Sequence, residues 1–332
     1  MPRRALAMLV LAAALLGGAV LLRLTIDPEG LSWPDSADLW GLRLTRAAAG
    51  VIVGGTLGLA GVLLQSLLRN PLASPDLIGP ASGAALAVTI ATYLHSLSRG
   101  AGAAVETAGA GMATGPAALV GATGALALVY TLSQRRGFVD PVSLVLIGVI
   151  ISITCGAAAT LFASLMPPTD SQSSLRWSLG MLSDETTPGA LMTGGAILLV
   201  SLAGAVWLGP AMDVAALSED EARASGVNLS WLRIALFAGA GVLTAAAVVL
   251  AGPIGFVGLV APHAVRLVAG PVHRTLAVGA VLAGAALVVF ADVGVRAVPL
   301  ETGRLPIGVI TALVGGPIFI ALLRTDPLRR GY

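Results

Sequence analysis

The chain has 332 residues, of which only 11% are charged, and its mean hydropathy is +0.92. Soluble domains carry about 25% charged residues, so this composition excludes a soluble globular fold. All nineteen basic residues are arginine. Without lysine the chain cannot form the G-K-[ST] phosphate loop of an ATP-binding site. The net charge of +2 gives no reason to expect nucleic acid as a partner.

Apolar stretches long enough to cross a bilayer as helices recur along the chain. They predict an all-α polytopic membrane protein with about ten spans in a single transmembrane domain, residues 1–332. Residues 1–24 predict a retained first helix rather than a signal peptide, because no small-residue cleavage site precedes the acidic segment 25–42. The other spans are expected at 44–68, 77–97, 112–133, 142–166, 190–208, 231–250, 254–268, 275–297 and 306–323.

The arginines predict the orientation of these spans. If the N-terminus is cytoplasmic and there are ten spans, twelve of the nineteen arginines fall inside and the other seven outside. Positive residues prefer the cytoplasmic side, so we expect both termini to be cytoplasmic.

Two halves of the chain are loosely similar to each other. Spans 2–5 and spans 7–10 each begin with an arginine and a Gly/Ala-rich helix, followed by a segment that proline interrupts. The interrupted segments are NPLASPDLIG (70–79) and GPIGFVGLVAPH (252–263). An odd number of spans separates the halves, so the pattern predicts an inverted repeat of the kind common in transporters.

Small residues form a stripe on the second span, where Gly50, Gly54 and Gly58 are spaced by four. Such a stripe lets two helix backbones approach closely in lipid. By itself it is equally typical of a packing face in any polytopic protein.

Few groups within the spans could carry chemistry. Asp292 and Arg296 are one helical turn apart, which favours a structural ion pair. His263 fits a satisfied internal group better than a proton relay. No carboxylate pair, catalytic triad or metal-ligand spacing occurs, and Cys155 is the single cysteine. We therefore expect no catalytic residue and no metal site.

The polar segment 209–231 predicts a short helix between two spans. Ser218 and Glu221 have the spacing of a capping box, and Gly226 is placed to end the helix. This element is either a plain linker or a docking helix for a soluble partner, and docking is favoured.

Several segments together resemble a known family. They are Arg43–x–x–Arg46, the NPLASPD run, the W-S-L-G around Trp177, and the stretches 251–274 and 291–323. In order and spacing the chain resembles the FecCD/BtuC-type permease subunit of ABC importers for iron-siderophore, haem or vitamin B12. The resemblance implies a multi-pass protein of the bacterial inner membrane that pairs with a second copy of itself. It also implies two ATP-binding subunits, which would hold ATP and Mg, and a periplasmic substrate-binding protein; no cofactor is expected on this chain.

The resemblance also implies roles for individual residues. Coupling to the ATPase is implied for Ser218, Glu219, Asp220, Glu221, Ala222, Arg223, Ala224, Ser225 and Gly226. A cytoplasmic gate is implied for Asn70, Leu72, Asp140, Pro141 and Val142. Docking of the binding protein is implied for Arg43, Arg46 and Arg296. One departure is Arg304, where the family usually has a glutamate directly before L-P-[VI]-G.

The resemblance further implies that the cargo passes along the axis of the dimer, beside the fifth span. Its small residues Gly148, Ser152, Gly156 and Ala159 suit either a wide passage or close packing. Arg176 could receive a carboxylate of the cargo, which favours haem over a ferric siderophore or cobalamin. The alternative function is an ion-coupled transporter or channel that works without ATP.

Overall fold

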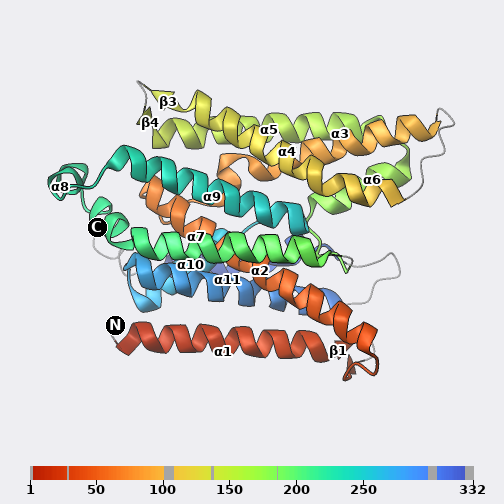
Figure 1. Cartoon of the computed structure of the whole chain (residues 1–332), viewed down its shortest axis with the longest axis horizontal. Coiled ribbons are helices and arrows are strands. Elements are labelled where there is room, and N and C mark those ends of the chain that lie inside the picture. The colour runs from red at the N-terminus through yellow and green to blue at the C-terminus, as the bar shows by residue number, and fades with distance from the viewer. Residues whose placement is uncertain are drawn as a thin grey trace.

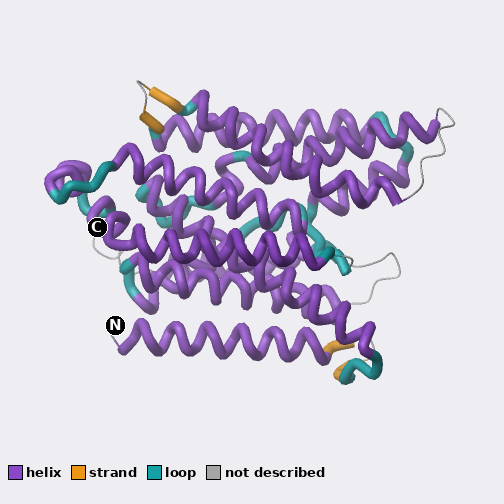
Figure 2. Tube along the Cα trace, viewed as in Figure 1, coloured by secondary structure: helices purple, strands orange, loops and turns teal. Residues whose placement is uncertain are grey.

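The computed structural model describes residues 3–27, 30–100, 108–135, 138–184, 186–297 and 305–325 (Figures 1 and 2). The helices are α1 (Arg3–Thr25), α2 (Ala37–Leu68), α3 (Pro80–Gly100), α4 (Ala108–Leu132), α5 (Pro141–Ser164), α6 (Pro168–Ser178), α7 (Pro188–Ala215), α8 (Glu219–Ala224), α9 (Leu229–Ala251), α10 (Val257–Ala269), α11 (His273–Ala297) and α12 (Ile307–Thr325), with a 3-10 turn, η1 (Pro75–Ile78). Two antiparallel hairpins pair β1 (Ile26–Asp27) with β2 (Gly30–Leu31) and β3 (Gln134–Arg135) with β4 (Phe138–Val139). Arg304 lies outside the described residues.

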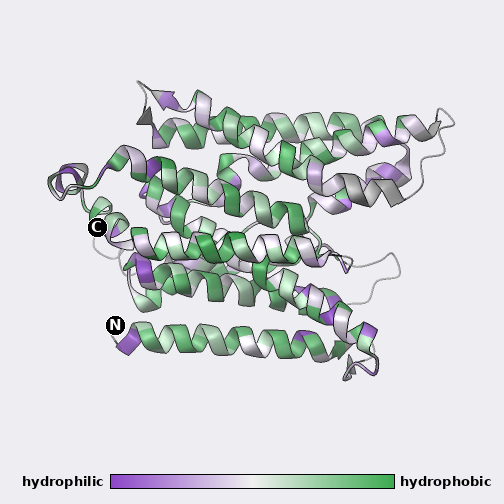
Figure 3. Cartoon of the chain, viewed as in Figure 1, coloured by the Kyte–Doolittle hydropathy of each residue, from purple (hydrophilic) through white to green (hydrophobic). Residues whose placement is uncertain are grey.

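The long helices run side by side, and apolar residues dominate along their lengths (Figure 3). Seven of the described helices are long and apolar enough to cross a membrane, and α10 and the described part of α12 are shorter apolar helices. With α3, which packs beside α4 and α5, they cover the segments expected as spans. The predicted all-α polytopic fold is confirmed.

The two ends of the bundle differ. The beginning of α1 lies at the same end as α8 and the β3–β4 hairpin, whereas the β1–β2 hairpin lies at the opposite end (Figure 1). We call these the α8 end and the β1 end. That the α8 end faces the cytoplasm remains a prediction from the arginine count.

Local sequence sets several helix boundaries. The Ser36 hydroxyl accepts a hydrogen bond from the Leu39 amide at the start of α2, and the Asn228 side chain accepts one from the Trp231 amide in α9. These side chains satisfy amides that have no partner within their helix. At the other end of α2, Arg69 adopts a left-handed conformation (φ 47°), and its amide bonds back to the last turn.

The centre of the fold is the contact between α2 and α11. A Cβ atom at Gly54 would overlap the carbonyl oxygen of Gly284, and one at Gly58 would overlap the carbonyl of Ala280. The backbones therefore touch through glycine, as the Gly stripe predicted. Gly50, one turn earlier, packs against the Val289 side chain.

The two interrupted segments meet inside the bundle. A Cβ at Gly61 of α2 would overlap the carbonyl of Gly258 in α10, and one at Gly258 would lie 2.5 Å from Cδ of Pro75 in η1. The break after α2 and the break before α10 are thus packed against each other. Inverted symmetry between the two halves remains a prediction.

The structure differs from the sequence expectation in α6, a helix within a segment expected only to be polar. Pro168 at its first position and Asp170 in its first turn suit a helix start. In addition, α2 begins at Ala37 rather than at residue 44, and α7 continues to Ala215 rather than ending at 208.

The glycine contact predicts a stability difference between two identical substitutions. Gly54→Ala places a methyl group between the α2 and α11 backbones and forces them apart. It should lower the free energy of unfolding by about 1–3 kcal/mol. Gly124→Ala is the control, because a Cβ there has no atom within 4 Å, and it should leave stability unchanged or raise it slightly. Thermal unfolding in detergent measures both. Equal melting temperatures for the two variants would contradict the close α2–α11 contact.

Candidate transport sites

A buried carboxylate joins three helices at the β1 end. Asp292 of α11 is 1% exposed and forms ion pairs with Arg23 of α1 and Arg46 of α2. The Arg46 guanidinium holds both Asp292 oxygens, with Nη2–Oδ1 at 2.7 Å and Nε–Oδ2 at 3.1 Å. Because breaking a buried pair leaves an uncompensated charge, this cluster fixes the three helices relative to one another.

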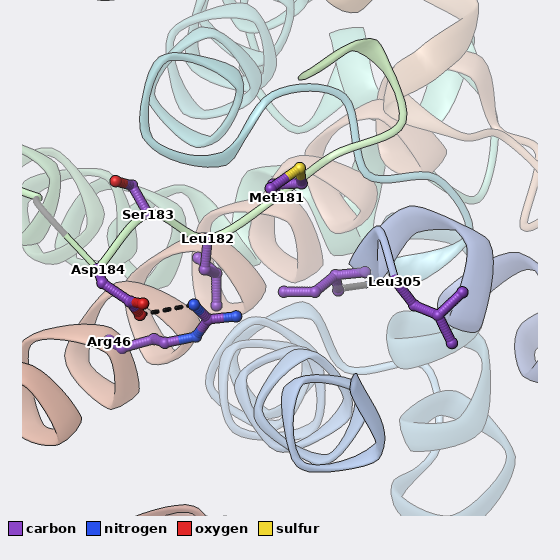
Figure 4. Close-up of a pocket in the computed structure, with 7 residues that line it drawn as sticks. Arg46, Met181, Leu182, Ser183, Asp184 and Leu305 are labelled. Atoms are coloured by element: carbon purple, nitrogen blue, oxygen red, sulfur yellow. Dashed lines mark hydrogen bonds and ion pairs between the residues drawn. The ribbon is translucent and has the colours of Figure 1, made fainter. Parts of the chain in front are cut away.

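A fourth member links the cluster to the connection between α6 and α7. Nη1 of Arg46 contacts Oδ1 of Asp184 at 2.6 Å, and the Asp184 side chain is 37% exposed. Figure 4 shows this pair beside Leu182 and Leu305 in a cavity of about 240 Å³. Asp184 is therefore the partly exposed member of an otherwise buried cluster.

The predicted docking arginines gather in one place. Arg43 is 4% exposed, and its Nη1 donates to the carbonyls of Leu24 at 2.7 Å and Ser32 at 3.0 Å. Arg43 and Arg296 line a second cavity of about 160 Å³, next to Asp184. The structure thus brings the three arginines together, but Arg43 and Arg46 are largely buried in contacts within the chain. Docking of a binding protein here remains a prediction.

The segment expected to couple to an ATPase is a capped helix. The Ser218 hydroxyl accepts from the Glu221 amide at 3.1 Å and donates to the Glu221 carboxylate at 2.8 Å. Gly226 has φ +79° and ends the turn, and its amide bonds to the Arg223 carbonyl. The serine cap and the glycine stop are as the sequence indicates, and the Glu221 carboxylate is held by the Ser218 hydroxyl.

The fold holds α8 by one side and exposes the other. Ala222 is fully buried in the core with Leu229 and Leu232 of α9, whereas Asp220, Glu221 and Arg223 are exposed (the expected coupling residues Ala224, Ser225 and Gly226 are exposed too). α8 projects beyond the spans between α7 and α9 (Figure 1). Force applied to its exposed face would therefore reach two spans directly.

The two predicted gate segments are both turns closed by side chains. The Asn70 Oδ1 accepts from the Leu72 amide at 2.9 Å, and Asp140 caps α5 by accepting from the Ser143 amide at 2.9 Å. Pro141 follows at the first helical position, and Val142 is 76% exposed. The geometry positions these residues; gating itself remains a prediction.

A larger cavity opens beside α5. Its volume is about 590 Å³, and it is lined by α3, α5, α12 and the interrupted segments. Ser152 and Gly156, two of the expected pathway residues, line it. Gly148 instead packs against the Leu77 carbonyl, because a Cβ there would overlap that oxygen. Ala159 lies further along α5 and is partly exposed.

Some site residues were not found from the sequence. Arg23 and Asp184 complete the charge cluster, yet Arg23 and Asp292 lie 269 positions apart in the sequence. Asp76 of η1 faces the larger cavity. Arg176, proposed from the sequence as a contact for the cargo, is partly buried at the end of α6 and is not among the residues that line this cavity.

The profile of the FecCD transport family matches residues 5–325. The chain belongs to this family. The resemblance predicted from the sequence is therefore confirmed, and so is its implication of a membrane-spanning permease.

Individual relatives agree over most of their length. The chain is 36% identical to the cobalamin import system permease protein BtuC of Halobacterium salinarum, over 87% of this chain and 73% of the relative. It is 36% identical to the vitamin B12 import system permease protein BtuC of Serratia proteamaculans, over 90% of this chain and 87% of the relative. A solved inward-facing metal-chelate type ABC transporter aligns with a TM-score of 0.82 and 28% identity, covering 97% of this chain and 100% of the other.

The charge cluster predicts unequal costs for two similar substitutions. Asp292→Asn leaves buried arginines without a counter-ion and should lower the free energy of unfolding by about 3–5 kcal/mol. Asp184→Asn removes a partly exposed partner and should cost nearer to 1 kcal/mol, as surface pairs do. Chemical unfolding of the purified protein in mixed detergent measures both. The cluster would lose its assigned role if Asp292→Asn were the milder change.

Proposed function

We propose that this permease subunit of an ABC importer carries cobalamin, or a closely related corrinoid, into the cytoplasm. The observation that carries the proposal is the match, over 87% and 90% of this chain, to permeases named for cobalamin and vitamin B12 import. Haem, which the sequence alone favoured, and ferric siderophores are the competing cargoes.

The working complex contains a second copy of this chain, two ATP-binding subunits and a substrate-binding protein. The chain lacks the lysine of a phosphate-binding loop, so ATP hydrolysis belongs to the separate subunits. The complex resides in the cytoplasmic membrane, with α8 on the cytoplasmic side.

In this proposal the two ends of the bundle have different partners. The exposed face of α8 sits in a groove of the ATPase subunit, and its movement is transmitted to α7 and α9. The acidic groups of the binding protein approach the β1 end near Arg43, Arg46 and Arg296. The cargo passes along α5, beside Ser152 and Gly156.

Uptake into proteoliposomes tests the function. The vesicles contain this chain with its native ATPase partner, ATP inside and the cognate binding protein outside. Cyanocobalamin, haem and ferrichrome are offered in turn. We expect accumulation of cyanocobalamin that requires internal ATP.

Other results would change the account in defined ways. Accumulation of haem or ferrichrome alone would contradict the proposed cargo, but it would still support an ATP-driven importer. Accumulation without ATP, driven by an ion gradient, would contradict the ABC mechanism and favour the ion-coupled alternative.

A matched pair of serine variants tests the coupling role of α8. Ser218→Ala removes the cap, which costs about 1 kcal/mol of helix stability and should weaken ATPase binding roughly fivefold. Ser173→Ala changes an exposed serine of α6, at the β1 end of the bundle (Figure 1), and should have little effect. Binding of the ATPase subunit and its stimulated hydrolysis measure the difference. Equal behaviour of the two variants would contradict docking through α8.

A further inference from the structure

One carboxylate in the large cavity has no part in the account so far. Asp76 belongs to η1, in the break between α2 and α3, and it lines the cavity of about 590 Å³ beside α5. Among the described residues that line this cavity it is the one charged side chain. An acid in an otherwise uncharged cavity of a membrane protein calls for a functional explanation.

The surroundings of Asp76 leave its charge uncompensated by a cation. Its Oδ2 accepts a hydrogen bond from the Ser74 hydroxyl at 3.1 Å. A Cβ atom at Gly255, in the other interrupted segment, would lie 3.6 Å from the same oxygen. The carboxylate therefore lies where the two breaks meet. No ion pair of Asp76 is found within the described part of the chain.

The rest of the lining is suited to a large, mostly apolar molecule with hydrogen-bonding groups. Hydroxyls come from Ser82, Ser152 and Ser178, and apolar surface comes from Phe256 and Leu313. Ser82 and Ser152 bond to each other at 3.2 Å and so form one polar patch. An acid beside hydroxyls attracts donors and cations and repels anions.

We propose that Asp76 makes this cavity a charge-selective subsite, which accepts a neutral or cationic, hydrogen-bond-donating face of the cargo and disfavours a carboxylate-bearing one. The inference rests on the proposed function and narrows its substrate class. The amide groups on the rim of a corrinoid supply such donors, whereas the propionates of haem are anions. Through Asp76 the membrane subunit itself selects among cargoes, in addition to the selection made by the binding protein.

The potential in the cavity can be measured without transport. Because Cys155 is the only cysteine, Cys155→Ala gives a background in which Ser152→Cys places a single thiol in the cavity. The full-length chain in liposomes is treated with a cationic trimethylammonium-ethyl methanethiosulfonate or with its anionic sulfonatoethyl counterpart. The ratio of the two labelling rates, relative to the ratio for a free thiol, reports the local charge.

We expect the cationic reagent to be favoured on the order of tenfold with Asp76 present, and Asp76→Asn to abolish the preference. Asp76→Glu should restore it, which separates loss of charge from loss of fold. Asp170→Asn, which removes an acid from α6 away from this cavity, should leave the ratio unchanged. A ratio that Asp76→Asn does not alter would overturn the proposal.

Protection by a probe tests the cargo contact. Cyanocobalamin should slow labelling of Ser152→Cys severalfold more in the Asp76 protein than in the Asp76→Asn protein. Equal protection of both, or none in either, would overturn the subsite. These readouts need no ATP, ATPase or binding protein, so their failure is distinct from a failure of uptake, which would instead refute the proposed function.

Discussion

The shared carboxylate of Asp292 is the interaction on which the arrangement of this bundle most depends. Apolar helices in lipid gain little from the hydrophobic effect, so specific contacts must choose their neighbours. Arg23 and Arg46 come from two different helices and meet on this one acid. An alternative packing of α1 or α2 would leave a charge buried without a partner, which is costly. The cluster therefore selects one arrangement at the β1 end.

Elsewhere in the bundle, close contacts between helix backbones, rather than ion pairs, determine how the helices pack. Gly54 and Gly284 let α2 and α11 touch, and Gly61 and Gly258 do the same for α2 and α10. These contacts place the two interrupted segments side by side. Non-helical backbone is tolerated at membrane depth only where protein buries it or a cavity borders it. The two interrupted segments meet both conditions, because they pack against each other and line the cavity that contains Asp76.

Features encoded locally were predictable from the sequence. The spans follow from apolar runs, α8 from the spacing of Ser218 and Glu221, and the α2 packing face from Gly54 and Gly58. The resemblance to the family followed from motifs distributed along nearly the whole chain. Each of these signals lies within a few residues, or in motifs that follow one another in a fixed order along the chain. Such signals can be recognised in the sequence alone.

Features that depend on tertiary contacts were not predictable. Arg296 is one turn from Asp292 and was the expected partner, but the sequence contained no sign that Arg23 and Arg46 would bond to that acid. From the sequence, Gly148 suited either a passage for the cargo or close packing. The contact with the Leu77 carbonyl, which only the structure reveals, shows that it serves close packing. α6 was missed because its residues are polar and its signals, a proline start and a nearby acid, are weak by themselves.

A double-mutant cycle between Arg46 and Asp292 tests the central claim most directly. Arg46→Met, Asp292→Leu and the combination are compared by chemical unfolding of the purified protein. If the cluster holds α2 to α11, each single change is strongly destabilising, and the double variant loses less stability than the sum of the two, by a coupling free energy of about 2–3 kcal/mol. The double variant stays less stable than the original chain, because Arg23 has lost its counter-ion. Effects that add to within about 0.5 kcal/mol would contradict the account and would leave Arg46 free for a partner outside the chain.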